Sequence, residues 1–215
     1  ASVAMQQVQR GRTWRAASPR PVVMLASSRE GEEALFLEQI RALAQSDIAG
    51  KAINSGAVEQ SSSLAQAAAS GSPTATLNTP VQWMIVPRHP QRFDAVAELV
   101  TQAGFTVSRR SQWHPSTQNT PQNAPQGAPQ SADVWLGDSL GEMALYYGLA
   151  DVALLGGSFA PLGGQNLIEA IAAGCPVVMG PHTFNFADAA QTALEQGAAL
   201  RVQGMAQGLG AAVAL

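Results

Sequence analysis

The sequence predicts an α/β fold built on a parallel, doubly wound sheet. Short apolar runs alternate along the chain with segments whose apolar residues have helical spacing, and this alternation is typical of βαβ units. No repeat with a fixed period is present. Apolar residues make up 46% of the 215 positions, enough to fill the core of such a domain.

Six apolar runs predict strands buried on both faces, as in parallel sheets covered by helices on each side. They lie at 21–26, 81–86, 134–136, 152–155, 176–179 and 198–202. Five segments between them predict helices from their apolar spacing. These helices lie at 30–44, 92–103, 142–149, 167–173 and 188–196.

Composition divides the chain into a lead-in and one domain. Residues 1–20 are expected to form a partly helical linker outside the core, and 21–215 the domain itself. Two low-complexity insertions interrupt that domain, at 46–80 (rich in Ala, Ser and Gly) and at 112–130 (rich in Gln, Asn and Pro). The second is expected to be disordered because it has few apolar anchors, and the first to hold a short helix near 63–69.

Charge and cysteine content exclude several classes of protein. A net charge of −3 gives no general attraction to nucleic acid, and no apolar stretch is long enough to span a membrane. The single cysteine, Cys175, cannot form an internal disulfide and is interpreted as a packing residue. The three histidines, His89, His114 and His182, lack the close spacing of a zinc motif, so no metal site is predicted.

In open α/β sheets ligands bind beyond the carboxyl ends of the strands, so the segments that follow the strands are the candidate sites. After the first strand, Ser27 and Glu30 have the spacing of a helix capping box. After the second, Arg88 lies between Pro87 and Pro90, in a stiff turn that would hold a guanidinium ready for phosphate or carboxylate. The alternative is a surface arginine before a helix that starts at Pro90.

The loop at 137–143 contains a second possible capping box, made by Ser139 and Glu142. A cap does not explain Gly141, which we expect inside the first helical turn, where glycine costs ~1 kcal/mol relative to alanine. Close approach of a ligand to the backbone would explain it.

Four glycines in the loop at 156–167 are expected to expose backbone N–H groups before a helix, which is a favourable arrangement for an anion. Asn166 suits the N-cap, and Glu169 either completes that cap or accepts both hydroxyls of a ribose. The loop is neither a dinucleotide-binding fingerprint nor a Walker A motif, so binding of NAD or ATP is not supported. In the next turn, His182 is either a phosphate or sugar ligand or a hydrogen-bonded turn residue.

Five strings, in this order, resemble the C-terminal, nucleotide-binding half of the 3-deoxy-D-manno-octulosonic acid (Kdo) transferases, which build the inner core of lipopolysaccharide. The strings are ASSREGEE (26–33), VPRHPQRF (86–93), GDSLGEM (137–143), GGS with GGQN (156–158 and 163–166) and GPHTFNF (180–186). Together they cover roughly 22–202.

The resemblance implies a Rossmann-like C-terminal domain of a GT-B glycosyltransferase, with CMP-Kdo as donor substrate and no cofactor. The implied acceptor is the lipid A precursor lipid IVA, at the cytoplasmic face of the bacterial inner membrane. The implied mechanism is inverting, with a glutamate base that, like the acceptor groove and the membrane anchor, belongs to an N-terminal half. We expect that half to be absent here, so that this chain is soluble and binds donor without transferring sugar.

The resemblance also assigns the CMP contacts to three loops. The implied residues are Pro87, Arg88, Leu140, Gly141, Glu142, Asn166, Leu167, Ile168 and Glu169, with Ser158, Gly164 and His182 as further candidates. Two alternatives remain at this stage: the donor domain of another GT-B transferase or a nucleotide-sugar epimerase, and a nucleotide-binding module without catalysis.

Overall fold

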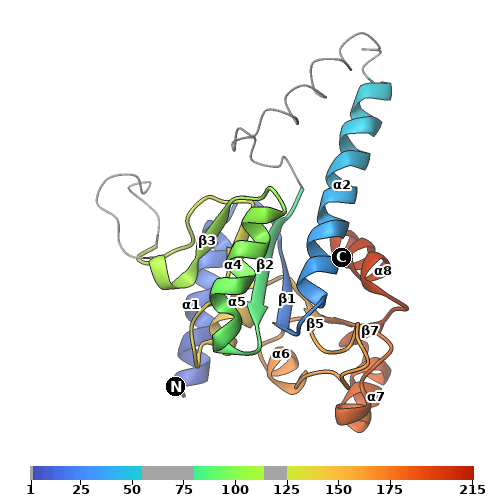
Figure 1. Cartoon of the computed structure of the whole chain (residues 1–215). Coiled ribbons are helices and arrows are strands. Elements are labelled where there is room, and N and C mark those ends of the chain that lie inside the picture. Colours follow the sequence, from blue (N-terminus) through green and yellow to red (C-terminus); the bar gives the residue numbers. More distant parts are fainter. Residues whose placement is uncertain (1, 55–79, 114–124) are drawn as a thin grey trace.

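A computed structural model describes residues 2–54, 80–113 and 125–215, with only the backbone over 47–54. Seven strands form one sheet in the order β3-β4-β2-β1-β5-β6-β7, and every neighbouring pair is parallel (Figure 1). The strands are β1 (Val22–Ser28), β2 (Gln82–Pro87), β3 (Val107–Arg109), β4 (Val134–Leu136), β5 (Val152–Leu155), β6 (Val177–Met179) and β7 (Ala199–Arg201). The predicted α/β class with a doubly wound parallel sheet is confirmed.

Helices cover both faces of the sheet, which explains why its strands are almost continuously apolar. One face packs against α1 (Val3–Ala17), α5 (Met143–Leu149), α6 (Ile168–Ala172) and α7 (Ala187–Glu195). The other packs against α2 (Glu32–Asn54), α4 (Phe93–Gln102) and α8 (Met205–Ala214). Three short 3-10 helices, η1 (Pro90–Arg92), η2 (Arg110–Gln112) and η3 (Phe184–Phe186), complete the described elements.

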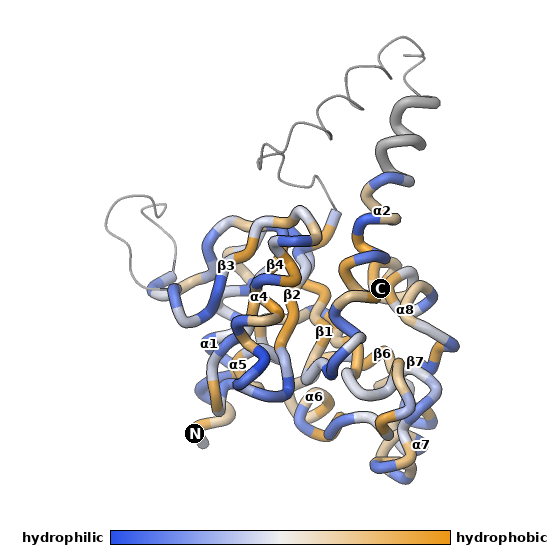
Figure 2. The backbone as a smooth tube through the Cα atoms, in the orientation of Figure 1, coloured by the Kyte–Doolittle hydropathy of each residue, from blue (hydrophilic) through white to orange (hydrophobic). Residues whose placement is uncertain are grey.

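The two cores are separated by the alternation of side chains along each strand. In β1, Val23 and Leu25 belong to the core beneath α2 and α4, while Met24 and Ala26 belong to the core beneath α1 and α5. The tube coloured by hydropathy shows this apolar centre, with the strands orange in the middle of the molecule (Figure 2).

All six predicted strands are present, and those at 134–136 and 152–155 have the predicted limits. The run at 198–202 forms β7, but burial on both faces is wrong there, because β7 is an edge strand whose residues are half-buried or exposed. The opposite edge strand, β3, was not predicted from the sequence.

The expectation that residues 1–20 contribute no core element is wrong. Helix α1 packs along α5, and its Trp14 is only 3% exposed, in edge-to-face contact with Trp113. The helices approach so closely that a Cβ atom built on Gly11 would lie 2.2 Å from the Leu145 carbonyl oxygen, and one on Gly148 would lie 2.3 Å from that of Val8. These two glycines therefore bring the helix backbones into contact.

Most of the two low-complexity insertions, 46–80 and 112–130, lies outside the described residues, as does the helix expected near 63–69. Helix α2 extends past the predicted end at residue 44, as far as Asn54.

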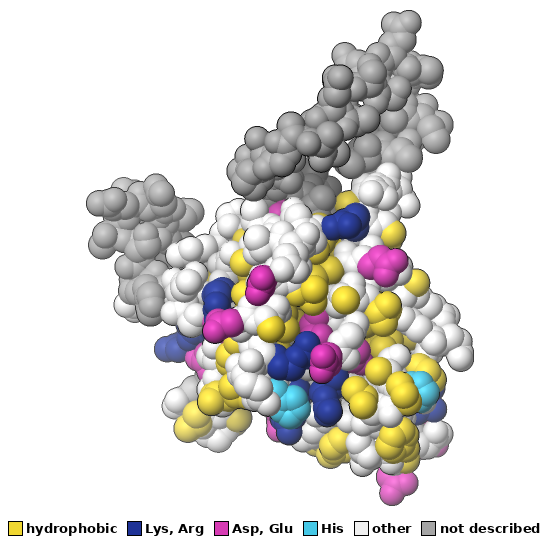
Figure 3. Space-filling view, in the orientation of Figure 1, with side chains coloured by type: hydrophobic (Ala, Val, Ile, Leu, Met, Phe, Trp, Pro, Cys, Tyr) yellow, Lys and Arg dark blue, Asp and Glu magenta, His cyan; other side chains and the backbone are white. Residues whose placement is uncertain are grey.

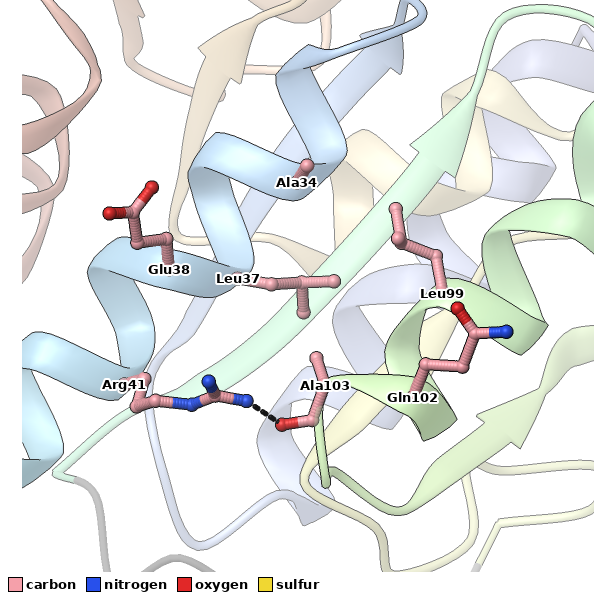
Figure 4. A pocket seen from close by; sticks show the side chains of 7 residues that line it. All are labelled: Ala34, Leu37, Glu38, Arg41, Leu99, Gln102 and Ala103. Carbon is pink, nitrogen blue, oxygen red and sulfur yellow. Dashed lines mark hydrogen bonds between the residues drawn. The ribbon is translucent and has the colours of Figure 1, made fainter.

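A shallow groove of about 280 Å³ runs between α2 and α4, on the face of the molecule remote from α1 (Figure 4). Leu37 and Leu99 lie on opposite sides of it. At one end Arg41 donates a hydrogen bond to the Ala103 carbonyl oxygen at the C-terminus of α4, and its guanidinium lies 5.9 Å from the ring centre of Phe105. Arg41 thus links the two helices across the groove.

Candidate functional site

Because all strands are parallel, the loops that follow them lie together at the carboxyl ends of the strands. This carboxyl edge of the sheet is the lower one in Figure 1. The predicted residues of the loops after β2, β4 and β5 therefore all lie along this edge, where Figure 3 shows arginine, acidic and histidine side chains gathered between α2, α4 and α6. Strand order reverses at β1, which pairs with β2 on one side and β5 on the other. This is the position at which open α/β sheets bind ligands.

A buried carboxylate, Glu32, lies beside this reversal and joins the loops after β1 and β5. Glu32 has no exposed surface, and it accepts hydrogen bonds from the N–H groups of Arg29 (2.9 Å), Gly157 (2.8 Å) and Phe159 (3.2 Å). Burial raises the pKa of Glu32, and the three N–H donors oppose that rise. The expectation that the glycine loop offers free N–H groups to a ligand is therefore wrong for Gly157 and Phe159, because Glu32 already occupies their donors.

The next residue, Glu33, links the start of α2 to β1 and to η1. It accepts a hydrogen bond from Ser28 Oγ at 2.7 Å and pairs with both terminal nitrogens of Arg92, at 2.7 and 3.2 Å. The capping box expected from Ser27 and Glu30 is wrong, because α2 begins at Glu32 and Ser27 lies within β1 with a left-handed φ of 53°.

The loop after β2 leaves one charged side chain available to a ligand. Pro87 is the buried last residue of β2, and Arg88 follows it with an exposed side chain. The Arg88 N–H donates to the Ser28 carbonyl oxygen at 3.0 Å, so the loops after β1 and β2 are joined at this point. The turn is fixed while the guanidinium faces solvent.

The loop after β4 is held by residues that are distant in sequence. Glu142 pairs with Arg110 at 2.8 Å and accepts from Ser139 Oγ, so Ser139 binds its side chain rather than forming the predicted backbone cap. Gln7 of α1 donates from Nε2 to the Gly141 carbonyl oxygen at 2.8 Å. Gly141 precedes α5 with φ +71°, which gives glycine a conformational reason at this position. Leu140, beside it, is 73% exposed.

The loop after β5 leads into α6, whose first residues are partly buried and partly exposed. Asn166 Oδ1 accepts from the N–H of Ile168 at 3.0 Å, and the Asn166 amide donates to Glu169 at 3.4 Å. Asn166 therefore binds the first turn of α6 as predicted, but from one residue before the N-cap position, which is Leu167. Ile168 and Glu169 are exposed, whereas Leu167 is fully buried. Leu167 can therefore meet a ligand only through its backbone.

The three further candidates have mainly structural surroundings. Ser158 is fully buried, and its Oγ donates to Leu155 and accepts from the Gly180 N–H at 2.8 Å. Gly164 is buried with φ +77°. His182 donates its backbone N–H to the Ser158 carbonyl oxygen at 3.1 Å, and its half-buried side chain lines a hollow beside α7.

Comparison with known proteins identifies the family. No family model matches the chain. The "3-deoxy-D-manno-octulosonic acid transferase" of Bordetella pertussis is 46% identical over 195 residues, which are 91% of this chain and 36% of that protein. The solved C-terminal CMP-Kdo binding domain of WaaA from Acinetobacter baumannii is 27% identical, with a TM-score of 0.66 over 98% of this chain and 87% of that one. This chain is homologous to the C-terminal part of the Kdo transferases.

The Kdo transferase of Haemophilus influenzae is also similar, at 39% identity over 130 residues, or 60% of this chain and 28% of that protein. The chain thus spans about a third of the length of the curated Kdo transferases it matches. Within the described ranges, no group of three or more His, Cys, Asp or Glu residues could hold a metal ion. No described helix has the length and hydropathy needed to cross a membrane.

Sequence reasoning also missed the role of the buried carboxylate of Asp138 beside the Kdo transferase loops. Asp138, directly after β4, accepts from Arg109 Nε (2.7 Å), from the Ser111 N–H (2.8 Å) and from Ser111 Oγ (2.6 Å). Although burial opposes ionisation, the Ser111 and Arg109 donors lower the pKa of Asp138. Arg109 ends β3, the strand that was not predicted, and Ser111 follows it, so no pattern in the sequence indicated that they lie beside Asp138.

We expect Asp138→Asn to lower the free energy of unfolding by about 1–3 kcal/mol at neutral pH, because the amide cannot accept from all three donors. Since the pKa is lower in the folded chain than in the unfolded one, the carboxylate stabilises the fold above the unfolded pKa of about 4, and this contribution is lost as pH falls through the folded pKa. Urea unfolding at pH 7 and in steps below pH 4 should show the gap between wild type and variant closing. The exposed Asp188→Asn is the control, and a gap that widens on acidification would contradict the assignment.

Proposed function

We propose that this chain binds CMP-Kdo as the donor-binding part of a Kdo transferase in lipopolysaccharide synthesis. The observation that carries the proposal is the likeness over 98% of the chain to a domain solved as CMP-Kdo binding. The position of the residues that the family resemblance assigns to CMP supports it, since they come from three loops that meet at one edge of the sheet.

Each part of the nucleotide has a matching group at this edge. Arg88 offers an exposed guanidinium to the phosphate. Glu169, exposed and beside Asn166, accepts the ribose hydroxyls. The exposed apolar side chains of Leu140 and Ile168 flank the base, and Gly141 brings the backbone within reach.

Glu142 and Leu167 have supporting roles in this proposal. Glu142 is paired with Arg110, so it fixes the loop and offers its remaining acceptor capacity to the nucleotide. Leu167 and Pro87 are buried, so they contribute through backbone groups alone.

In the whole enzyme the donor is a substrate, and no cofactor or metal takes part. We propose that a glutamate in an N-terminal half activates an acceptor hydroxyl of lipid IVA, which displaces CMP with inversion. That half would also hold the membrane contact at the cytoplasmic face of the inner membrane. The chain studied alone would bind donor and transfer no sugar.

Calorimetric titration of this chain with CMP, and with UMP as the competing nucleotide, tests the proposal. We expect CMP to bind more tightly than UMP, and Arg88→Ala and Glu169→Ala each to weaken CMP binding by ~10-fold or more, because each removes a hydrogen bond to a charged group. Arg10→Ala on α1 and Glu98→Ala on α4 are matched controls at exposed positions and should leave the affinity unchanged.

Equal binding of CMP and UMP would favour the donor domain of a different GT-B transferase. A folded chain that binds neither nucleotide would contradict the proposed function. CMP binding that is unaffected by both substitutions would keep the function and overturn the assignment of Arg88 and Glu169.

A further inference from the structure

A hollow of about 430 Å³ opens at the carboxyl edge of β6 and β7, beyond the loops assigned to CMP. Its volume is within the ~300–1,000 Å³ typical of small-molecule sites. The side chains that line it and carry the argument are His182, Thr183, Phe184, Asp188, Gln191 and Arg201.

The hollow contains a cation without an acidic partner. Arg201 is the last residue of β7, and its Nη2 donates to Thr183 Oγ1 at 2.9 Å, which orients the guanidinium. In the described part of the chain, no carboxylate forms an ion pair with Arg201. Thr183 is buried, so the orientation comes from a fixed hydroxyl, and the rest of the guanidinium fork remains available.

The segment after β6, which lines the hollow, is hydrogen-bonded to the glycine loop after β5. Asn185 donates from Nδ2 to the Leu162 carbonyl oxygen at 3.0 Å. The backbone N–H of Asn185 donates to the Gly163 carbonyl oxygen, also at 3.0 Å. The loops after β5 and β6 are thus joined beside the hollow. The start of α6 follows β5 and Arg201 ends β7, so both lie at the carboxyl ends of the strands.

We propose that this hollow holds the sugar-acid part of the donor, with Arg201 binding its carboxylate. The inference rests on the proposed function and deepens it, because the CMP residues account for the nucleotide only. Asp188, Gln191 and His182 supply acceptors and donors for sugar hydroxyls, and Phe184, which is 64% exposed, offers an apolar surface to the carbon chain. Water solvates the exposed Arg201 in the free chain, and a sugar carboxylate would add a charge-assisted hydrogen bond that a neutral sugar cannot make.

The test compares two ligands, CMP and CMP-Kdo, titrated into wild type and into Arg201→Ala. The wild-type chain should bind CMP-Kdo more tightly than CMP. Arg201→Ala should weaken CMP-Kdo binding by ~10-fold or more and leave CMP binding unchanged, as expected for loss of a hydrogen bond between charged groups. Unchanged CMP binding also shows that the variant is folded. Thr183→Val, which removes the orienting hydroxyl, should reduce part of the difference in affinity between CMP-Kdo and CMP. Arg10→Ala should leave that difference unchanged.

The outcomes separate the two proposals. Failure of the wild-type chain to bind either ligand would contradict the proposed function itself. If wild type binds CMP but gains nothing from the sugar, or if Arg201→Ala keeps the full advantage of CMP-Kdo, the sugar-acid subsite is overturned. A loss of CMP binding in folded Arg201→Ala would place the phosphate at Arg201 and also overturn it.

Discussion

Gly11→Ala is expected to lower the free energy of unfolding by about 3 kcal/mol, the upper end of the cost of overpacking a close contact. The new methyl group would lie 2.2 Å from the Leu145 carbonyl oxygen and 2.7 Å from the Leu149 nitrogen. Because both are backbone atoms of α5, no side chain can rotate away, and α1 must move off α5. Denaturant unfolding of the purified variant measures the effect.

Gly210→Ala is the matched control for this substitution. Gly210 also lies inside a helix, α8, but its added Cβ would meet nothing within 4 Å. Alanine there should stabilise the chain by roughly 0.5–1 kcal/mol through helix propensity. Equal effects of the two substitutions would show that α1 does not pack on α5 as described.

Glu32→Ala is expected to cost roughly 3 kcal/mol in unfolding free energy, because three backbone N–H groups would lose their acceptor together. The donors come from the loops after β1 and β5, so no single neighbour can replace the carboxylate. Glu32→Gln keeps one oxygen that can accept and should fall between wild type and Glu32→Ala.

Glu30→Ala, two residues earlier and exposed, is the control and should change the unfolding free energy by less than about 0.5 kcal/mol. The comparison is made by urea unfolding at one pH. A Glu32→Ala variant as stable as Glu30→Ala would mean that the glycine loop is held by other contacts.

The fold was predictable from the sequence wherever a segment carries its own signal. The apolar run of β5 and the apolar spacing of α4 depend on neighbours within each segment, and both were found. Helix α1 gave no such signal, since its contact with α5 depends on Gly11, and a glycine inside a helix is unfavourable until its partner is known. The three residues of β3 include Arg109 and alternate in burial at an edge, so they lack the apolar run of a central strand.

The candidate site was predictable in position and less so in detail. Parallel strands must send their following loops to one edge, and this placed Arg88, Gly141 and Glu169 correctly along it. The local caps expected at Ser27 and Ser139 were wrong, because Ser27 has a left-handed φ before a helix that starts later, and Ser139 binds the side chain of Glu142, which Arg110 holds. Glu32 binds Gly157, 125 residues away, and no short-range pattern contains that information.

The position of β1 in the sheet also has a consequence for how the chain folds. Strands β1 to β4 form one half of the sheet and are all made before β5, whose Val152 pairs with Val23. Pairing β5 with β1 brings together segments that are far apart in the sequence, which costs loop-closure entropy. Strands β1 to β4 can therefore assemble before β5 is added to the sheet. The junction between β1 and β5 therefore forms after the first four strands, and the candidate site, whose loops follow strands on both sides of that junction, is complete only when β5 has paired with β1.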